Sequence, residues 1–269
     1  MADALLSAPT PGPAHAAVAV RAAASAQVFV DDVAAPLPSA PDARHLGTVL
    51  RLRAGEEVIV SDGAGHWARA HWDPRALRAR AVLAPVRDGD GPGGDGSIQF
   101  EPAEQPELTV AFAPTKGERP EWVVQKLTEL GIDRIVPLVT ARSVVRWDGD
   151  RAAHAVARLR RTAREAAAQS RRVWLPTVTD VLEFREVVTL GPPGAVVLAQ
   201  LSGERPDPSR RVVAVGPEGG WSDEELDAGL PTVGFGLSVL RAETAAVTAG
   251  ALMASLRTGT VAPVGATRA

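Results

Sequence analysis

The stretch Val212-Val213-Ala214-Val215-Gly216-Pro217-Glu218-Gly219-Gly220 joins an apolar run to a glycine-rich turn, and Ser222 and Glu225 follow directly. An unbroken apolar run is typical of a β-strand covered on both faces, as in a parallel sheet. Ser222 with a glutamate three residues later is a capping box, which predicts that a helix begins there. The segment therefore predicts a strand–turn–helix unit of an α/β domain.

The glycine-rich turn 216–220 allows the backbone to approach a ligand closely, because glycine carries no side chain. It is not a phosphate loop, since the GxxxxGK[ST] pattern is absent and Glu218 would repel a polyphosphate. A neutral or cationic ligand fits better, for example a nucleoside that carries a sulfonium. A tight structural turn without a ligand is the alternative.

The surrounding sequence alternates strands and helices from Leu108 onward, which favours a parallel α/β sheet. Strands are predicted over 108–113, 135–139 and 196–199. A helix is predicted from Pro120 to Gly131, and a long helix is predicted from its apolar stripe. The apolar positions are Val123, Leu127 and Leu130 in the first helix and Val156, Leu159, Ala163 and Ala166 in the second.

The N-terminal part differs in character. Residues 1–25 are rich in Ala and Pro without periodicity, which predicts a mobile tail. Residues 27–86 predict a small β-barrel, with strands at 57–61 and 77–83. Its one helix is expected to be capped by Asp42, with Ala43, Leu46, Val49 and Leu50 as its apolar face. The run 88–96 (DGDGPGGDG) predicts a linker, so we expect domains at 26–96 and 97–269.

Composition excludes several chemistries. The 269 residues include no cysteine, which rules out disulfides, cysteine-bound metals and a thiol nucleophile. His66 and His71 would point to opposite faces of a strand, so we expect no metal site. No apolar run is long enough to span a membrane, and the Ala-rich start lacks the basic region of a secretory signal. We therefore expect a cytoplasmic protein without a membrane partner.

The net charge of −3 hides a segregation of charge. Nine arginines lie between positions 141 and 172, against only Asp148, Asp150 and Glu165. Glu165, Gln169 and Arg172 share one polar stripe of the long helix. Guanidinium groups at this density suit phosphate contacts, and a solvated helix face is the alternative.

Arg241 and Glu243 interrupt an otherwise apolar stretch at 237–245. They are either paired with each other or held for a ligand. The helix predicted over 245–256 consists largely of small residues, which suits close packing against another element, either within one subunit or in a dimer.

Taken together, these features resemble the 16S ribosomal RNA uridine-N3 methyltransferases of the SPOUT superfamily. The resemblance extends from Gln27 to Leu256. The matching stretches are His45-Leu46…Val49-Leu50-Arg51 with Gly55; Lys116-Gly117 with Gln125-Lys126…Glu129-Leu130-Gly131; Arg142-Ser143-Val144-Val145; Glu165-Ala166…Gln169-Ser170…Arg172; Gly216-Pro217-Glu218-Gly219-Gly220; and Leu240-Arg241…Glu243-Thr244-Ala245.

The resemblance implies a PUA-like RNA-binding barrel before a trefoil-knotted parallel-sheet domain, in a homodimer with active sites at the interface. It also implies S-adenosylmethionine as the cofactor, S-adenosylhomocysteine as the product, and a cofactor site among the loops 198–202, 216–220 and 237–243. Ala242 departs from the threonine usual in the family. The implied cofactor-binding residues are Leu198, Gln200, Gly216, Pro217, Glu218, Gly219, Gly220, Leu237, Leu240, Arg241, Glu243 and Thr244.

The implied substrate is 16S rRNA within the small ribosomal subunit, methylated at N3 of a uridine. Arg241 is the first catalytic candidate, Arg142 from the partner subunit the second, and Glu218 or a water molecule the base. The candidate RNA-binding residues are Arg51, Lys116, Arg142, Arg146, Arg164, Arg171 and Arg172.

Other functions stay open. One is a related knotted enzyme that methylates a ribose 2′-hydroxyl or another base. Another is a non-catalytic RNA-binding protein of ribosome assembly. A nucleotide-binding oxidoreductase is disfavoured because GxGxxG is missing.

Overall fold

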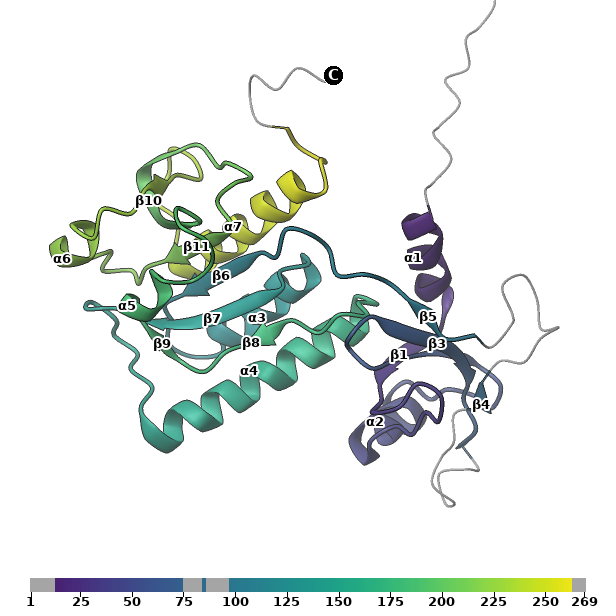
Figure 1. Ribbon diagram of the computed structural model, residues 1–269. Coiled ribbons are helices and arrows are strands. Elements are labelled where there is room, and N and C mark those ends of the chain that lie inside the picture. Colours follow the sequence, from purple (N-terminus) through teal and green to yellow (C-terminus); the bar gives the residue numbers. More distant parts are fainter. Residues whose placement is uncertain (1–12, 75–83, 86–96, 263–269) are drawn as a thin grey trace, which may run out of the picture. The chain divides into compact units, whose positions relative to one another are not determined.

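The computed structural model describes residues 13–74, 84–85 and 97–262, which form two compact units (Figure 1). The first unit ends at Pro102 and also includes the short segment Arg171–Val173. The second contains Ala103–Ser170 and the chain from Trp174 onward. The predicted strand 77–83 and the predicted linker 88–96 lie outside the described residues.

The first unit contains a mixed sheet in the order β1 (Ala26–Phe29), β2 (Glu57–Ser61), β3 (His66–His71) and β4 (Ala84–Pro85), with β5 (Gln99–Phe100) also paired to β3. β1 runs parallel to β2, and the other pairs are antiparallel. This small sheet agrees with the PUA-like domain that was expected.

The helix predicted from Asp42 is only partly as expected. α2 (Ala40–Arg44) is capped by Ser39, whose Oγ accepts a hydrogen bond from the Asp42 backbone N–H. The chain then widens into the π-helical turn η1 (His45–Val49), and the Leu50 N–H donates to the His45 carbonyl at 2.9 Å. The wider turn rotates the following residues, so Leu46 is buried whereas Val49 and Leu50 are exposed.

The expectation of a mobile tail is wrong for residues 13–23, which form the helix α1 (Pro13–Ala23). Arg21 holds this helix in the first unit. Its side chain is buried, its Nε donates to the Arg171 carbonyl at 3.0 Å, and it pairs with Glu101. Its guanidinium also lies 5.2 Å from the centroid of the Trp67 ring. These partners are distant in sequence, so local periodicity could not reveal the helix.

The second unit contains a parallel sheet, as predicted. The order is β12 (Thr232–Val233), β10 (Val196–Glu204), β11 (Val212–Val215), β6 (Thr109–Phe112), β7 (Arg134–Val139) and β8 (Thr177–Val178), with β9 (Leu182–Glu183) also paired to β7. Every pair in this sheet is parallel.

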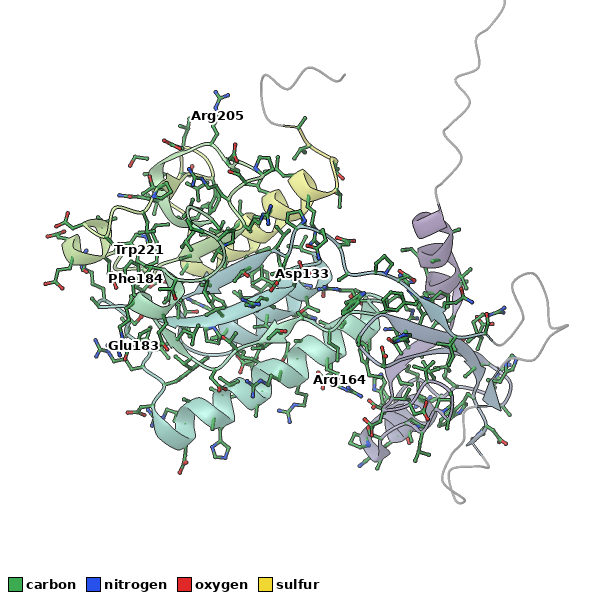
Figure 2. The ribbon with its side chains drawn as sticks, in the orientation of Figure 1. Asp133, Arg164, Glu183, Phe184, Arg205 and Trp221 are labelled. Carbon is green, nitrogen blue, oxygen red and sulfur yellow. The ribbon has the colours of Figure 1, made fainter. Side chains whose placement is uncertain are left out.

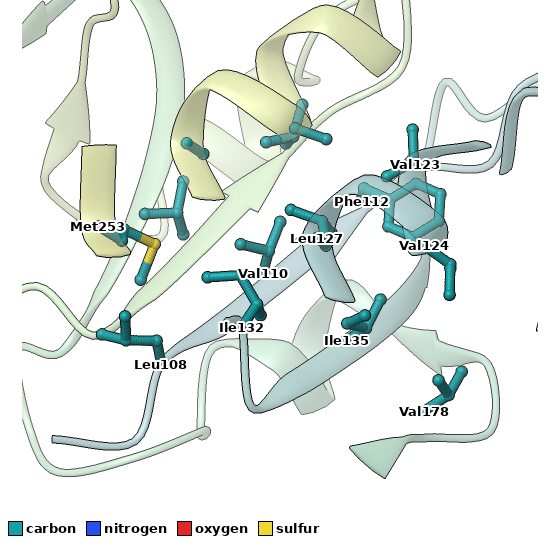
Figure 3. Close-up of a cluster of buried hydrophobic side chains, with 14 of the residues drawn as sticks. Leu108, Val110, Phe112, Val123, Val124, Leu127, Ile132, Ile135, Val178 and Met253 are labelled. Carbon is teal, nitrogen blue, oxygen red and sulfur yellow. The ribbon is translucent and has the colours of Figure 1, made fainter. Parts of the chain in front are cut away.

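Helices cover both faces of this sheet. α3 (Arg119–Glu129), α4 (Gly149–Gln169) and α7 (Ala242–Arg257) supply one cluster, which Figure 3 shows around β6 and β7. The short helices α5 (Phe184–Val187) and α6 (Asp223–Leu226) supply the other cluster. Val213 and Val215 belong to the first cluster and Ala214 to the second, which explains the unbroken apolar run of β11.

The backbones of the parallel neighbours β10 and β12 approach each other very closely. Val233 pairs with both Ala199 and Glu204, so residues 200–203 form an excursion around it. A Cβ on Gly203 would lie 2.3 Å from the Val233 carbonyl carbon. Only glycine fits at position 203, and the excursion contributes to the cavity described next.

Candidate active site

A cavity of about 340 Å³ opens at the carboxyl ends of β10 and β11. This is where ligands bind in open parallel sheets. Three loops and the start of α7 enclose it. The lining residues are Ala199, Gln200, Leu201, Val215, Gly216, Pro217, Glu218, Gly220, Trp221, Leu226, Phe235, Gly236, Ser238, Val239, Leu240, Ala242 and Ala245.

The structure brings about half of the predicted cofactor residues to this cavity. Those that line it are Gln200, Gly216, Pro217, Glu218, Gly220 and Leu240. Leu198 lies in the core instead, and the Leu237 side chain is fully exposed. Gly219, Arg241, Glu243 and Thr244 also stand outside the lining.

Trp221 is a lining residue that sequence reasoning missed. Its ring is buried and lies against Gly216, where an added Cβ would be 3.1 Å from Cε2. Its Nε1 donates to the Ala199 carbonyl at 3.0 Å, and the Phe184 ring centroid is 5.7 Å away (Figure 2). Trp221 thus connects the end of β10 to the glycine-rich turn. A tryptophan directly after Gly219-Gly220 was the available signal.

The predicted capping box at Ser222 is confirmed. The Glu225 N–H donates to Ser222 Oγ at 3.2 Å, and the Ser222 N–H donates to Glu225 Oε2 at 2.8 Å. The buried Glu225 carboxylate also accepts a hydrogen bond from the Ala141 N–H at 2.8 Å. This second bond fixes the loop after β7 beside the glycine-rich turn.

Arg142 follows in that loop, and its Nη1 donates to the Gly219 carbonyl at 3.2 Å. The resemblance had assigned Arg142 to the partner's site, yet it contacts the glycine-rich turn of its own chain. Gly219 therefore faces Arg142 rather than the cavity.

Arg241 and Glu243 are not paired with each other. Arg241 is the exposed N-cap residue of α7 and has no ion pair among the residues that the structure describes. The Glu243 side chain is mostly buried, and its Oε1 lies 3.4 Å from Arg119 Nη1. The same Arg119 atom is 3.8 Å from Glu218 Oε1. Sequence reasoning did not single out Arg119.

The predicted RNA-binding residues are divided between the two units. Lys116, Arg142, Arg146 and Arg164 belong to the second unit, and Arg51, Arg171 and Arg172 to the first. Arg142 and Arg146 are exposed in one loop, and Arg164 is a half-buried residue of α4.

Arg171 is engaged within its own unit, since its Nη2 donates to the Ala24 carbonyl at 2.9 Å. Burial lowers the pKa of Arg171. The Arg172 carbonyl accepts a hydrogen bond from Gln27 Nε2 at 2.6 Å. Within the first unit, Arg171 thus makes a side-chain contact and Arg172 makes a backbone contact.

Within the described ranges, no group of three or more His, Asp or Glu side chains could hold a metal ion. No helix in the described part of the chain has the length and apolarity needed to cross a bilayer.

Two family models match the chain. An RNA methyltransferase domain matches residues 102–254, more than half of the 269 residues, and an RNA methyltransferase PUA domain matches residues 38–71. With the fold, these matches define an RNA methyltransferase with a parallel-sheet catalytic domain and a PUA domain.

Individual relatives narrow this class. The chain is 34% identical over 229 residues to the ribosomal RNA small subunit methyltransferase E of Mycobacterium tuberculosis, covering 76% of this chain and 80% of that protein. It is 28% identical over 224 residues to the Bacillus subtilis protein of the same name, with 76% and 83% covered. The chain belongs to the ribosomal RNA small subunit methyltransferase E family.

Solved structures of related proteins agree with this family and fold. A Neisseria gonorrhoeae ribosomal RNA small subunit methyltransferase E bound to S-adenosylmethionine has a TM-score of 0.69 and 25% identity, covering 86% of this chain and 97% of that one. A Legionella pneumophila putative methyltransferase in complex with S-adenosylmethionine has a TM-score of 0.69 and 26% identity, with 84% and 96% covered.

Proposed function

We propose that the protein transfers a methyl group from S-adenosylmethionine to N3 of a uridine in 16S ribosomal RNA. The observation that carries this proposal is the cavity at the glycine-rich turn 216–220. The printed names of the relatives support a substrate in the small ribosomal subunit, and the bound ligand of the solved relatives supports the cofactor. Since this substrate is ribosomal, we also propose that the enzyme acts in the cytoplasm.

The cavity fits this cofactor. Its walls are mainly apolar, with Leu201, Trp221 and Phe235 available to cover a nucleoside. Its size lies in the range of small-molecule sites. Glu218 contributes a carboxylate, which suits a cationic sulfonium and opposes a polyphosphate. Bound there, the cofactor would supply an electrophilic methyl group.

The chain itself must align and activate the uracil. N3 lies on the pairing edge of the base, so the target nucleotide must be unpaired or flipped out. N3 becomes nucleophilic when its proton leaves, and Glu218 or a water molecule accepts that proton. Arg241 then stabilises the negative charge on the uracil oxygens. The chain contains no cysteine, so it cannot use the covalent mechanism in which a cysteine attacks carbon 6 of the pyrimidine.

We further propose that the enzyme is a homodimer with a trefoil-knotted catalytic domain. Apolar side chains at Val144, Leu237 and Val239 are 72%, 101% and 84% exposed, which supports burial against a second copy. The close passage of residues 200–203 around Val233 supports the knot.

The deciding experiment is methylation of unmodified small ribosomal subunits, followed by mass spectrometry of the nucleosides. We expect 3-methyluridine. A methylated ribose would favour the related knotted enzymes, and failure to bind S-adenosylmethionine in calorimetry would favour a non-catalytic assembly protein.

RNA with 5-fluorouridine at the target should be methylated and released, and a covalent protein–RNA band on a denaturing gel would contradict the mechanism.

The exposed loop after β7 gives a prediction about RNA binding. Changing Arg142 and Arg146 together to Gln should lower the slope of log affinity against log salt by roughly 1.4 to 1.8, since each phosphate contact contributes roughly 0.7–0.9. Arg185→Gln is the matched control, because Arg185 is exposed on α5 and pairs with Glu183. Filter binding over a range of salt concentrations measures the slope, and an unchanged slope would move the RNA surface elsewhere.

A further inference from the structure

Arg119, the first residue of α3, lies between two carboxylates of the active site. Its Nη1 is 3.4 Å from Glu243 Oε1 and 3.8 Å from Glu218 Oε1. Both distances are those of ion pairs. The mechanism proposed above gives Arg119 no role.

The two carboxylates come from different elements of the cavity. Glu218 belongs to the glycine-rich turn and lines the cavity, whereas Glu243 lies in the first turn of α7 between the lining residues Ala242 and Ala245. Arg119 therefore connects the glycine-rich turn to the start of α7. That start includes Arg241, the N-cap residue.

Arg119 is the one cation within ion-pair distance of either carboxylate in the described part of the chain. Glu243 needs a compensating charge most, because its side chain is only 12% exposed and its Oε2 is buried without a hydrogen-bond partner there. Glu218 is 62% exposed, so its carboxylate would rotate freely without a tether. One guanidinium with several N–H donors can serve both groups at once.

The position of Arg119 is well determined by the fold. Pro120 stands in the first turn of α3 and is buried, and Val123, Val124 and Leu127 anchor the helix in the core. The guanidinium therefore projects from a rigid element toward the glycine-rich turn and the first turn of α7.

We propose that Arg119 is a positioning residue for methyl transfer: it directs Glu218 toward the reacting uridine and holds the first turn of α7, with Arg241, in its working orientation. This inference rests on the proposed function. It predicts an effect on the chemical step rather than on cofactor binding, because a misplaced catalytic group slows the reaction more than it weakens the binding of the cofactor.

Arg119→Met tests the proposal. We expect kcat for methylation of small ribosomal subunits to fall roughly 10- to 100-fold. The dissociation constant for S-adenosylmethionine, measured by calorimetry, should stay within about twofold of the wild-type value, since the variant loses an interaction that matters for the chemical step and not for binding of the cofactor. Arg119→Lys should restore part of kcat, because an ammonium keeps the positive charge but lacks the planar fork of N–H donors.

A double-mutant cycle shows whether Arg119 acts through Glu218. Adding Arg119→Met to Glu218→Gln should lower kcat by a smaller factor than Arg119→Met lowers it in the wild type, because Glu218→Gln has already removed one of the two contacts through which Arg119 acts. Arg185→Met is the matched control. Arg185 is exposed and pairs with Glu183 at 3.0 Å, outside the cavity lining, so kcat of this variant should be unchanged.

Wild-type kcat in Arg119→Met, or additive losses in the cycle, would overturn the inference. A parallel fall of kcat and melting temperature without rescue by lysine would also overturn it, since that result would mean that Arg119 only stabilises the fold. If the wild-type enzyme itself neither binds S-adenosylmethionine nor methylates RNA, the proposed function fails first, and this outcome is separate from the behaviour of the variants.

Discussion

Gly203→Ala is expected to lower the free energy of unfolding by about 3 kcal/mol and to abolish formation of the cavity at the glycine-rich turn. The added Cβ would lie 2.3 Å from the Val233 carbonyl carbon and 2.6 Å from the Val233 and Gly234 nitrogens. All these atoms belong to the backbone, so no side-chain rotation relieves the overlap. The excursion 200–203 must then move, and Gln200 and Leu201 leave the cavity wall.

Thermal unfolding and calorimetry with S-adenosylmethionine measure both consequences. A loss of this size corresponds to roughly 6–12 °C in melting temperature for a protein of this length. Gly229→Ala is the control, because Gly229 has a φ of 71° but open space around its Cβ position. It should cost about 1 kcal/mol of backbone strain and leave cofactor binding intact. If the Gly203→Ala variant were as stable as the Gly229→Ala variant, the close approach of Gly203 to the Val233 backbone would be contradicted.

Arg241→Ala is expected to lower kcat roughly 100- to 1,000-fold, the effect of removing one group that stabilises a developing oxyanion. Cofactor affinity should change little, because negative charge on the uracil oxygens develops mainly after N3 is deprotonated. Stability should be preserved, since Arg241 is exposed and pairs with no acid in the described part of the chain. Single-turnover methylation and calorimetry separate the two quantities.

Arg205→Ala provides the matched control, because Arg205 is an exposed arginine of the same unit that does not line the cavity (Figure 2). Its rate should equal that of the wild type. Equal losses of rate and cofactor affinity in Arg241→Ala would assign Arg241 to the cofactor site instead of the chemical step.

Local sequence patterns predicted the parallel α/β domain and the position of its glycine-rich turn. The apolar run Val212–Val215 and the capping box at Ser222 are local patterns, and both appear in the structure where they were predicted. The apolar stripe of α4 likewise predicted its buried face, which includes Val156 and Leu159. Such patterns succeed because burial on a strand or helix follows the period of the backbone.

Long-range contacts set which residues complete the candidate site and which polar groups are engaged elsewhere. Trp221 reaches Ala199, Glu225 reaches Ala141, and Arg119 reaches Glu243, each across a long separation in sequence. Arg171, expected to bind RNA, instead donates to the Ala24 carbonyl. A buried polar group must find a partner wherever the fold provides one, and that partner has no fixed spacing in sequence. These contacts therefore emerge only after the chain has folded.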